Sequence, residues 1–199
     1  MRRLVAATTN QGKLREIEAI LAPLNWEIVS PQFYPGFPEI EEHGTTFEAN
    51  AVEKALATAA FTGETALADD SGLEVDYLGG APGVYSARFA GEPKDDAANN
   101  NKLLGLLDGV PREQRAARFR CVIAVAFPEG GVVTADGRCE GFILTELRGA
   151  GGFGYDPLFY LPEFDKTFAE LPPEVKNRVS HRARALAKIK EKLAGLTGK

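Results

Sequence analysis

Two neighbouring carboxylates, Asp69 and Asp70, directly follow the apolar run Thr65–Ala68 and precede Ser71 and Gly72. A carboxylate at the end of a strand can bind Mg²⁺ or accept a proton from water. Adjacent residues of a strand point to opposite faces, so the two aspartates need not act as a pair, and one is expected to be structural. The alternative without chemistry is a turn in which the side chains bond to the backbone.

Further carboxylates gather upstream of this pair. Ten Asp and Glu residues and a single lysine lie between Gly36 and Tyr77, and Glu41 and Glu42 belong to the loop before the next predicted helix. Together with Asp70 such a loop can complete a site for a hard cation, because Mg²⁺ often takes one or two carboxylates plus substrate phosphates. The alternative is a solvated acidic face.

The segment Thr8–Lys13 joins an apolar run to a helical pattern, so its backbone N–H groups lie at a helix N-terminus, where anions bind. Two hydroxyls, an amide and a lysine add to this, and the composition is that of a phosphate cradle. The spacing of a Walker A loop is missing. The alternative is an ordinary helix cap.

Two segments near the C-terminus complete the set of chemically interesting residues. The loop 151–157 combines three glycines with Phe153 and Tyr155, whose rings offer faces for a base. The stretch 176–192 holds seven Lys or Arg and one Glu, and it contains Lys176, His181 and Arg182. The alternative for the loop 151–157 is that its aromatic rings simply fill the core. The alternative for the stretch 176–192 is a solvated basic helix face.

These side chains need a scaffold of strands and helices. Apolar runs and alternation predict strands at Leu4–Ala7, Trp26–Val29, Thr65–Ala68, Leu73–Leu78, Arg118–Phe127 and Val132–Leu147. Helical spacing predicts helices over Leu14–Leu24, Phe47–Phe61 and Asp95–Leu107, and one long last helix that begins at Pro172 and Pro173. Thr45 and Glu48 match a capping box. The pattern indicates an α/β protein with a mixed, twisted sheet and helices on both sides.

The composition restricts the class of protein. The chain has 199 residues, 44% hydrophobic and 26% charged, which is typical of one globular domain over 1–199, at most with two tightly packed lobes. The net charge of −5 argues against a nucleic-acid partner, and the apolar runs are too short for a membrane helix. Two cysteines form no disulfide framework, so a cytoplasmic location is expected.

Six ordered motifs resemble the inosine triphosphate pyrophosphatase family over nearly the whole chain. They are Thr8–Lys13, Thr46–Ala51, Ala68–Leu73, Gly79–Arg88, Gly152–Pro157 and Ser180–Arg182. The resemblance implies an elongated fold with two lobes flanking an active-site cleft, and a homodimer. It also implies Mg²⁺-dependent hydrolysis of inosine, deoxyinosine and xanthosine triphosphates to the monophosphate and pyrophosphate, which removes such nucleotides from the pool.

The resemblance also assigns roles to individual residues. Asp70 becomes the proton acceptor and a metal ligand, and Glu41 becomes the second metal ligand, with Glu42 one residue away. The positions matching the family's substrate contacts are Thr8, Thr9, Asn10, Gln11, Gly12, Lys13, Ser71, Phe153, Gly154, Tyr155, Asp156, Lys176, His181 and Arg182.

Hydrogen-bond donors can distinguish hypoxanthine from adenine at position 6. Arg182 can only donate hydrogen bonds, so facing the 6-carbonyl of hypoxanthine it would be satisfied, and facing the 6-amine of adenine it would not. Two alternative functions remain open: a pyrophosphatase for other modified nucleotides, and a module that binds purine nucleotides without hydrolysing them.

Overall fold

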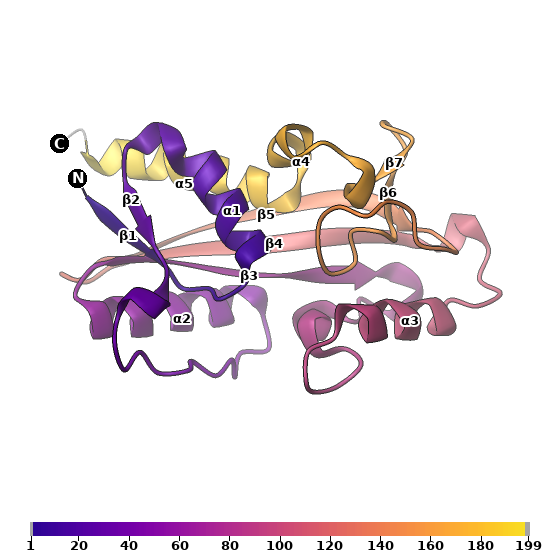
Figure 1. Ribbon diagram of the computed structural model, residues 1–199, viewed down its shortest axis with the longest axis horizontal. Helices are drawn as coiled ribbons and strands as arrows, with labels where there is room; N and C mark the ends of the chain where they lie inside the picture. Colours follow the sequence, from indigo (N-terminus) through magenta and orange to yellow (C-terminus); the bar gives the residue numbers. More distant parts are fainter. Residues whose placement is uncertain (1, 198–199) are drawn as a thin grey trace. The chain divides into compact units, whose positions relative to one another are not determined.

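The computed structural model describes residues 2–197, and it contains one open sheet of seven strands (Figure 1). Their order is β2-β1-β3-β4-β5-β6-β7. β1 pairs in parallel with β2 and β3, whereas β6 pairs antiparallel with β5 and β7, so the predicted mixed sheet is confirmed. The strands are β1 (Arg3–Ala6), β2 (Glu27–Val29), β3 (Thr65–Val75), β4 (Ala116–Ala126), β5 (Val132–Ile143), β6 (Phe159–Leu161) and β7 (Lys166–Thr167).

Five α-helices accompany the sheet in the described residues. They are α1 (Gln11–Leu21), α2 (Phe47–Thr62), α3 (Asp96–Leu106), α4 (Pro173–Val179) and α5 (His181–Thr197). Among the residues described, no helix combines the length and the apolar character needed to cross a membrane.

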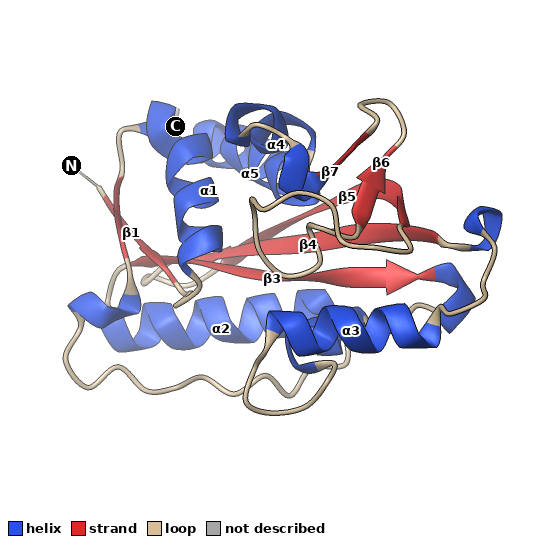
Figure 2. Ribbon diagram, turned by 45° about the vertical axis from the view of Figure 1, so that its right-hand side comes forward, coloured by secondary structure: helices blue, strands red, loops and turns tan. Residues whose placement is uncertain are grey.

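The chain divides into two compact units, and β3, β4 and β5 run from one into the other. The first unit comprises the residues up to Asp70, Cys121–Gly137 and the residues from His181 on. In this unit α1 and α5 lie on one face of the sheet and α2 lies on the other (Figures 1 and 2). Its core packs α1 and α5 against the strands through apolar side chains that include Leu4, Ile17, Leu67, Ile123, Leu186 and Ile189.

The second unit comprises Ser71–Arg120 and Arg138–Ser180 and has its own core. Three aromatic rings form its centre. The ring of Phe119 lies 4.7 Å from that of Phe159 and 5.7 Å from that of Phe168, measured between centroids. Such contacts add to the burial of their large apolar area. They fix the strands from which the aromatic loop at 151–157 extends.

The sequence predicts a break after Ala68, but β3 is one continuous strand of eleven residues. Asp69 and Asp70 therefore lie in the middle of a strand, not at its end or in a turn. The alternation of side chains across the sheet continues through both aspartates and sends them to opposite faces. The prediction that the two carboxylates separate is confirmed, whereas the predicted strand end is wrong.

The predicted long last helix is two helices. Ser180 is extended, with φ −67° and ψ 160°, and it separates α4 from α5. His181 and Arg182 consequently start a new helix. The predicted capping box is also wrong: Thr46, not Thr45, accepts the N–H of Ala49, and the Glu48 carboxylate accepts the hydroxyl of Thr134.

Gly137 in β5 allows this new helix to begin close to the sheet. A Cβ atom at this position would lie 2.1 Å from the carbonyl oxygen of His181 and 2.6 Å from the amide nitrogen of Ala185. Real Cβ atoms do not approach backbone this closely, so any other residue would push the first turn of α5 outward. The absence of a side chain at Gly137 thus sets the position of that turn.

Candidate active site

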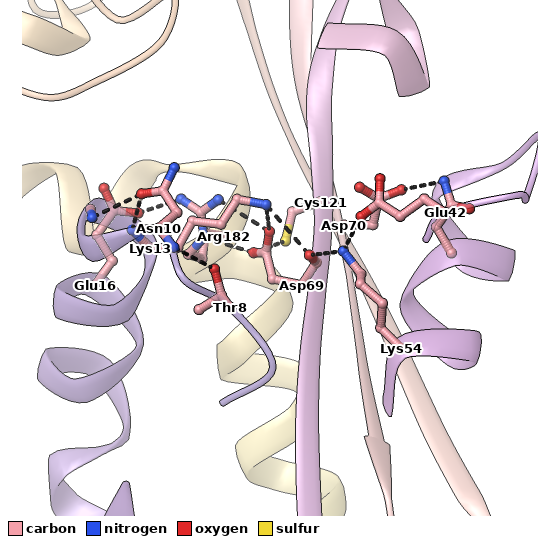
Figure 3. Close-up of polar contacts among 12 residues, drawn as sticks. Thr8, Asn10, Lys13, Glu16, Glu42, Lys54, Asp69, Asp70, Cys121 and Arg182 are labelled. Carbon is pink, nitrogen blue, oxygen red and sulfur yellow. Dashed lines mark hydrogen bonds and ion pairs between the residues drawn. The ribbon is translucent and has the colours of Figure 1, made fainter. Parts of the chain in front are cut away.

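The two aspartates of β3 have different surroundings in the first unit (Figure 3). The Asp69 side chain has no exposed surface, and it accepts hydrogen bonds from Arg182 Nε at 2.7 Å and from the Cys121 thiol at 3.1 Å. The ammonium of Lys13 lies 2.5 Å from its second oxygen. Burial alone would raise the pKa of Asp69, but the charges of Arg182 and Lys13 outweigh burial and hold that pKa well below its ordinary value.

Asp70 faces the other side of the strand and has weaker support. Its Oδ2 accepts a hydrogen bond of 3.0 Å from Asn50 Nδ2, which comes from α2. Burial raises the pKa of Asp70, the charge of Lys54 opposes this, and the nearby carboxylate of Glu42 adds to it. A buried carboxylate with a raised pKa is a candidate proton acceptor near neutral pH.

Lys54 is a residue that the sequence argument missed. Its ammonium pairs with the Glu42 carboxylate and donates to the carbonyl oxygen of Asp69 at 3.0 Å. The Lys13 ammonium also approaches that carbonyl, at 3.4 Å. Two lysines from different helices thus converge on the peptide between Asp69 and Asp70. The available signal was Lys54 itself, the single cation within the acidic stretch.

The predicted phosphate cradle is formed only in part. The Asn10 side chain caps α1 and accepts the N–H groups of Gly12 and Lys13, at 2.9 and 3.1 Å, while the Thr8 hydroxyl accepts the N–H of Asn10. Two of the backbone N–H groups predicted to bind phosphate therefore already donate to a side chain. This is the ordinary helix cap that the sequence analysis gave as the alternative. Lys13 is the single cation of this segment, and its ammonium pairs with the carboxylate of Asp69. Thr9 and Gln11 are exposed.

The acidic loop places its carboxylates unequally. Glu42 is near enough to Asp70 to raise its pKa, whereas the side chain of Glu41 is 78% exposed and lies 3.5 Å from His43. The described residues contain no preformed group of three or more His, Cys, Asp or Glu side chains suited to a metal ion. Mg²⁺ does not require one, because it commonly keeps water and substrate phosphates as ligands.

The second unit gathers the predicted residues of the aromatic loop around one carboxylate. Asp156 Oδ2 accepts the N–H of Phe153 at 2.9 Å and the ammonium of Lys176 at 2.6 Å. The Lys176 ammonium also lies 4.6 Å from the centre of the Phe153 ring. Gly152 has a φ of +72°, and a Cβ there would lie 2.1 Å from Asp156 Oδ2. This close approach requires glycine, and it fixes the Phe153 ring relative to Lys176.

Two neighbouring loop residues have structural partners. The N–H of Gly154 donates to Asp96 Oδ2 at 2.8 Å, and its carbonyl accepts from Asn100 Nδ2 at 2.9 Å. Tyr155 is buried, and its hydroxyl donates to the carbonyl of Ser86 at 2.7 Å. Burial raises the pKa of this phenol. Tyr155 therefore packs as part of the core, and Phe153 is the half-buried ring of this loop.

The motif after α4 is divided between the units. Ser180 ends the second unit, and Ser71 begins it, directly after Asp70. His181 and Arg182 belong to the first unit and are buried, with Arg182 only 1% exposed. Nε and Nη1 of Arg182 face Asp69 and Glu16. Reading of a base by Arg182 stays a prediction.

Comparison with known proteins gives these residues a family context. A model of the Ham1 family matches residues 4–192. The chain belongs to the Ham1 family. The match covers all six motifs, and the predicted resemblance is confirmed.

Relatives of this Ham1 protein are similar over almost their full length. A protein of Desulforamulus reducens named dITP/XTP pyrophosphatase is 65% identical over 189 residues, covering 95% of this chain and 94% of the relative. One of the same name from Geobacter sulfurreducens is 58% identical over 193 residues, covering 97% of each. The solved structure of the Staphylococcus aureus Ham1 protein superposes with a TM-score of 0.86 at 41% identity, covering 98% and 99% of the two chains.

Proposed function

We propose that this protein hydrolyses non-standard purine nucleoside triphosphates, those of inosine, deoxyinosine and xanthosine, to the monophosphate and pyrophosphate. The observation that carries the proposal is the pair of lysines, Lys13 and Lys54, converging beside the buried carboxylate of Asp70. A general base next to two cations is what an attack of water on a phosphate requires. The names of the relatives supply the class of substrate.

Asp70 accepts the proton of the attacking water. Attack on the α-phosphorus needs a base within hydrogen-bond reach of that water, and its pKa must lie near the working pH. Burial brings the pKa of Asp70 upward toward that range. The Asn50 amide holds one carboxylate oxygen, which leaves the other for water. Turnover therefore rises with pH as Asp70 loses its proton.

Lys13 and Lys54 stabilise the negative charge that builds up on the departing pyrophosphate. Positive groups placed before the reaction stabilise such charge more strongly than mobile solvent does. Both ammonium groups are held in position by contacts to Asp69, Lys13 through the carboxylate and Lys54 through the backbone carbonyl. The substrate thus meets oriented cations.

A Mg²⁺ ion is part of the proposal, with Asp70 and the acidic loop as its protein ligands. The donor set fits a hard cation, because the carboxylates of Asp70 and Glu42 lie near each other. When bound, the ion would neutralise the charge of the triphosphate. Glu42 is the loop carboxylate beside Asp70, and Glu41, the ligand implied by the resemblance, stays a prediction.

Within the second unit, the Phe153 ring is the candidate platform for a purine base. The ring offers a face for stacking, and the Lys176 ammonium over the ring and the Asp156 carboxylate that pairs with it are a donor and an acceptor nearby. The homodimer, the cytoplasmic location and the position of a cleft stay predictions. The alternatives named above, another modified nucleotide as substrate and binding without hydrolysis, are separated by the following experiment.

Purified protein with Mg²⁺ is expected to release pyrophosphate from inosine, deoxyinosine and xanthosine triphosphates, and much more slowly from adenosine triphosphate. The products are measured by ion chromatography, with chelator in place of Mg²⁺ as the control. Orthophosphate as the direct product would contradict cleavage between the α- and β-phosphates. Pyrophosphate release is also measured over a series of Mg²⁺ concentrations for the unmodified protein, Glu41→Gln and Glu42→Gln. The variant that needs more Mg²⁺ identifies the carboxylate that binds the ion.

A further inference from the structure

Four charged side chains in the first unit form a ring of three ion pairs, which is closed through the first half of α1. Starting on α1, the Lys13 ammonium lies 2.5 Å from Asp69 Oδ1 on β3, and Asp69 Oδ2 accepts Nε of Arg182 on α5 at 2.7 Å. Nη1 of Arg182 then lies 2.5 Å from Glu16 Oε2, back on α1. Lys13 and Glu16 are three residues apart, so they are neighbours on the same face of the helix. The ring therefore ties one turn of α1 to β3 and α5.

The ring is balanced in charge, and three of its four members, Glu16, Asp69 and Arg182, are buried. Two cations and two carboxylates alternate around it, and the side chains of Arg182 and Glu16 are 1% and 11% exposed. Ion pairs of this kind are held together only while every member keeps its partner, because an uncompensated buried charge is costly. Without the carboxylate of Glu16, Asp69 would have to compensate both Arg182 and Lys13.

Three observations single out Glu16 within this ring. It is a charged residue on the buried face of α1, next to Ile17, where an apolar residue would be expected. Its carboxylate accepts a hydrogen bond from Nη1 of Arg182, which comes from a helix far away in the chain. The first turn of α5, which carries Arg182, is itself fixed against Gly137 of β5. The backbone of Arg182 is thus fixed in this turn. Its guanidinium contacts two carboxylates, Glu16 through Nη1 and Asp69 through Nε and, at 3.4 Å, through Nη2.

We propose that Glu16 is a positioning residue, which sets the Lys13 ammonium for the triphosphate by holding Arg182 away from full engagement with Asp69. This inference rests on the proposed function. Glu16 itself touches no substrate. Removing its charge draws the guanidinium further onto Asp69, and the Lys13 ammonium loses the orientation that Asp69 gives it. The effect on turnover is transmitted through Lys13.

A double-mutant cycle between Glu16 and Lys13 tests the proposal. We expect Glu16→Gln alone to lower kcat/KM for inosine triphosphate by about tenfold or more, and by less than about twofold when Lys13→Met is already present. Folding is monitored by circular dichroism and by Tm, and kinetics are measured well below the Tm of each variant. The matched control is Glu18→Gln, an exposed position of the same helix.

The outcomes separate the two proposals. If neither the unmodified protein nor the Glu18→Gln variant releases pyrophosphate, the proposed function is wrong. If both are active and Glu16→Gln lowers kcat/KM by the same factor in the two Lys13 backgrounds, Glu16 is merely structural and the inference is overturned. Full activity of Glu16→Gln would overturn it too. Should Glu16→Gln fail to fold, Glu16→Asp replaces it, because this variant keeps the charge on a shorter side chain. We expect Glu16→Asp to lower kcat/KM roughly threefold, and this decrease must disappear when Lys13→Met is already present.

Discussion

Replacing Asp70 by asparagine is expected to lower kcat for inosine triphosphate by about 10²–10⁴-fold, the usual cost of losing a general base. An asparagine of nearly the same shape can still accept the hydrogen bond that Asn50 donates to Asp70. It cannot take a proton from water, and it is a poorer ligand for a hard cation. The measurement is steady-state release of pyrophosphate at saturating Mg²⁺.

Two further measurements distinguish loss of the general base from weaker nucleotide binding and from the loss of a negative charge. Nucleotide affinity of Asp70→Asn, measured by calorimetry with chelator present, should stay within a modest factor of the unmodified protein. The Glu53→Gln variant, an exposed carboxylate on α2, serves as the control for a lost negative charge. A turnover number for Asp70→Asn near that of the control would exclude Asp70 as the base.

The second large effect concerns stability and contrasts the two neighbouring aspartates. Asp69→Asn is expected to lower the free energy of unfolding by about 3–5 kcal/mol, because Arg182 and Lys13 lose the buried carboxylate that compensates them. Asp70→Asn should leave the stability of the metal-free protein unchanged or raise it, since burial disfavours the ionised Asp70 carboxylate. Urea unfolding at pH 7 with chelator measures both.

The pH dependence follows from the direction of the Asp69 pKa shift. A carboxylate whose pKa is depressed by folding contributes stability above its unfolded pKa of about 3.9, and this contribution is lost as pH falls toward the depressed value. The difference in unfolding free energy between the unmodified protein and Asp69→Asn should therefore be full at pH 6–7, as a rough window, and shrink in acid. A difference that stays constant down to pH 3, roughly one unit below the unfolded value, would contradict the ionised network.

Most of the scaffold could be predicted because its signals are local. Alternation over Arg118–Phe127 and helical spacing over Asp95–Leu107 correspond to β4 and α3 within two residues at each end. The continuity of β3 could not be predicted in this way. The polar run Asp69–Gly72 reads as a turn, and only its tertiary partners, such as Arg182 of α5, make it stable inside a sheet.

The break between α4 and α5 could not be predicted from the sequence for a related reason. Ser180 and His181 fit a helix by propensity, and the apolar stripe continues on both sides of them. At Gly137, β5 comes close to the carbonyl of His181. These residues are far apart in the chain, so no local sequence pattern predicts the contact. The new start at His181 is nevertheless what directs Arg182 toward Asp69.

The candidate site was predictable in its residue types and less so in its pairings. Asp70 and Lys13 could be identified from motifs. The burial of Arg182 between two carboxylates could not be predicted, because the sequence shows only that this residue is a hydrogen-bond donor. Lys54 was visible as an isolated cation in an acidic stretch. Tyr155 and Phe153 look alike in sequence, and only packing shows that the first is buried in the core.

The position of the bond that breaks tests the central claim most directly. Hydrolysis is carried out in water enriched in ¹⁸O, and the two products are separated and analysed by mass spectrometry. Attack on the α-phosphorus by water that Asp70 has deprotonated predicts one ¹⁸O atom in the nucleoside monophosphate and none in the pyrophosphate. Label in the pyrophosphate, with an unlabelled monophosphate, would contradict the account.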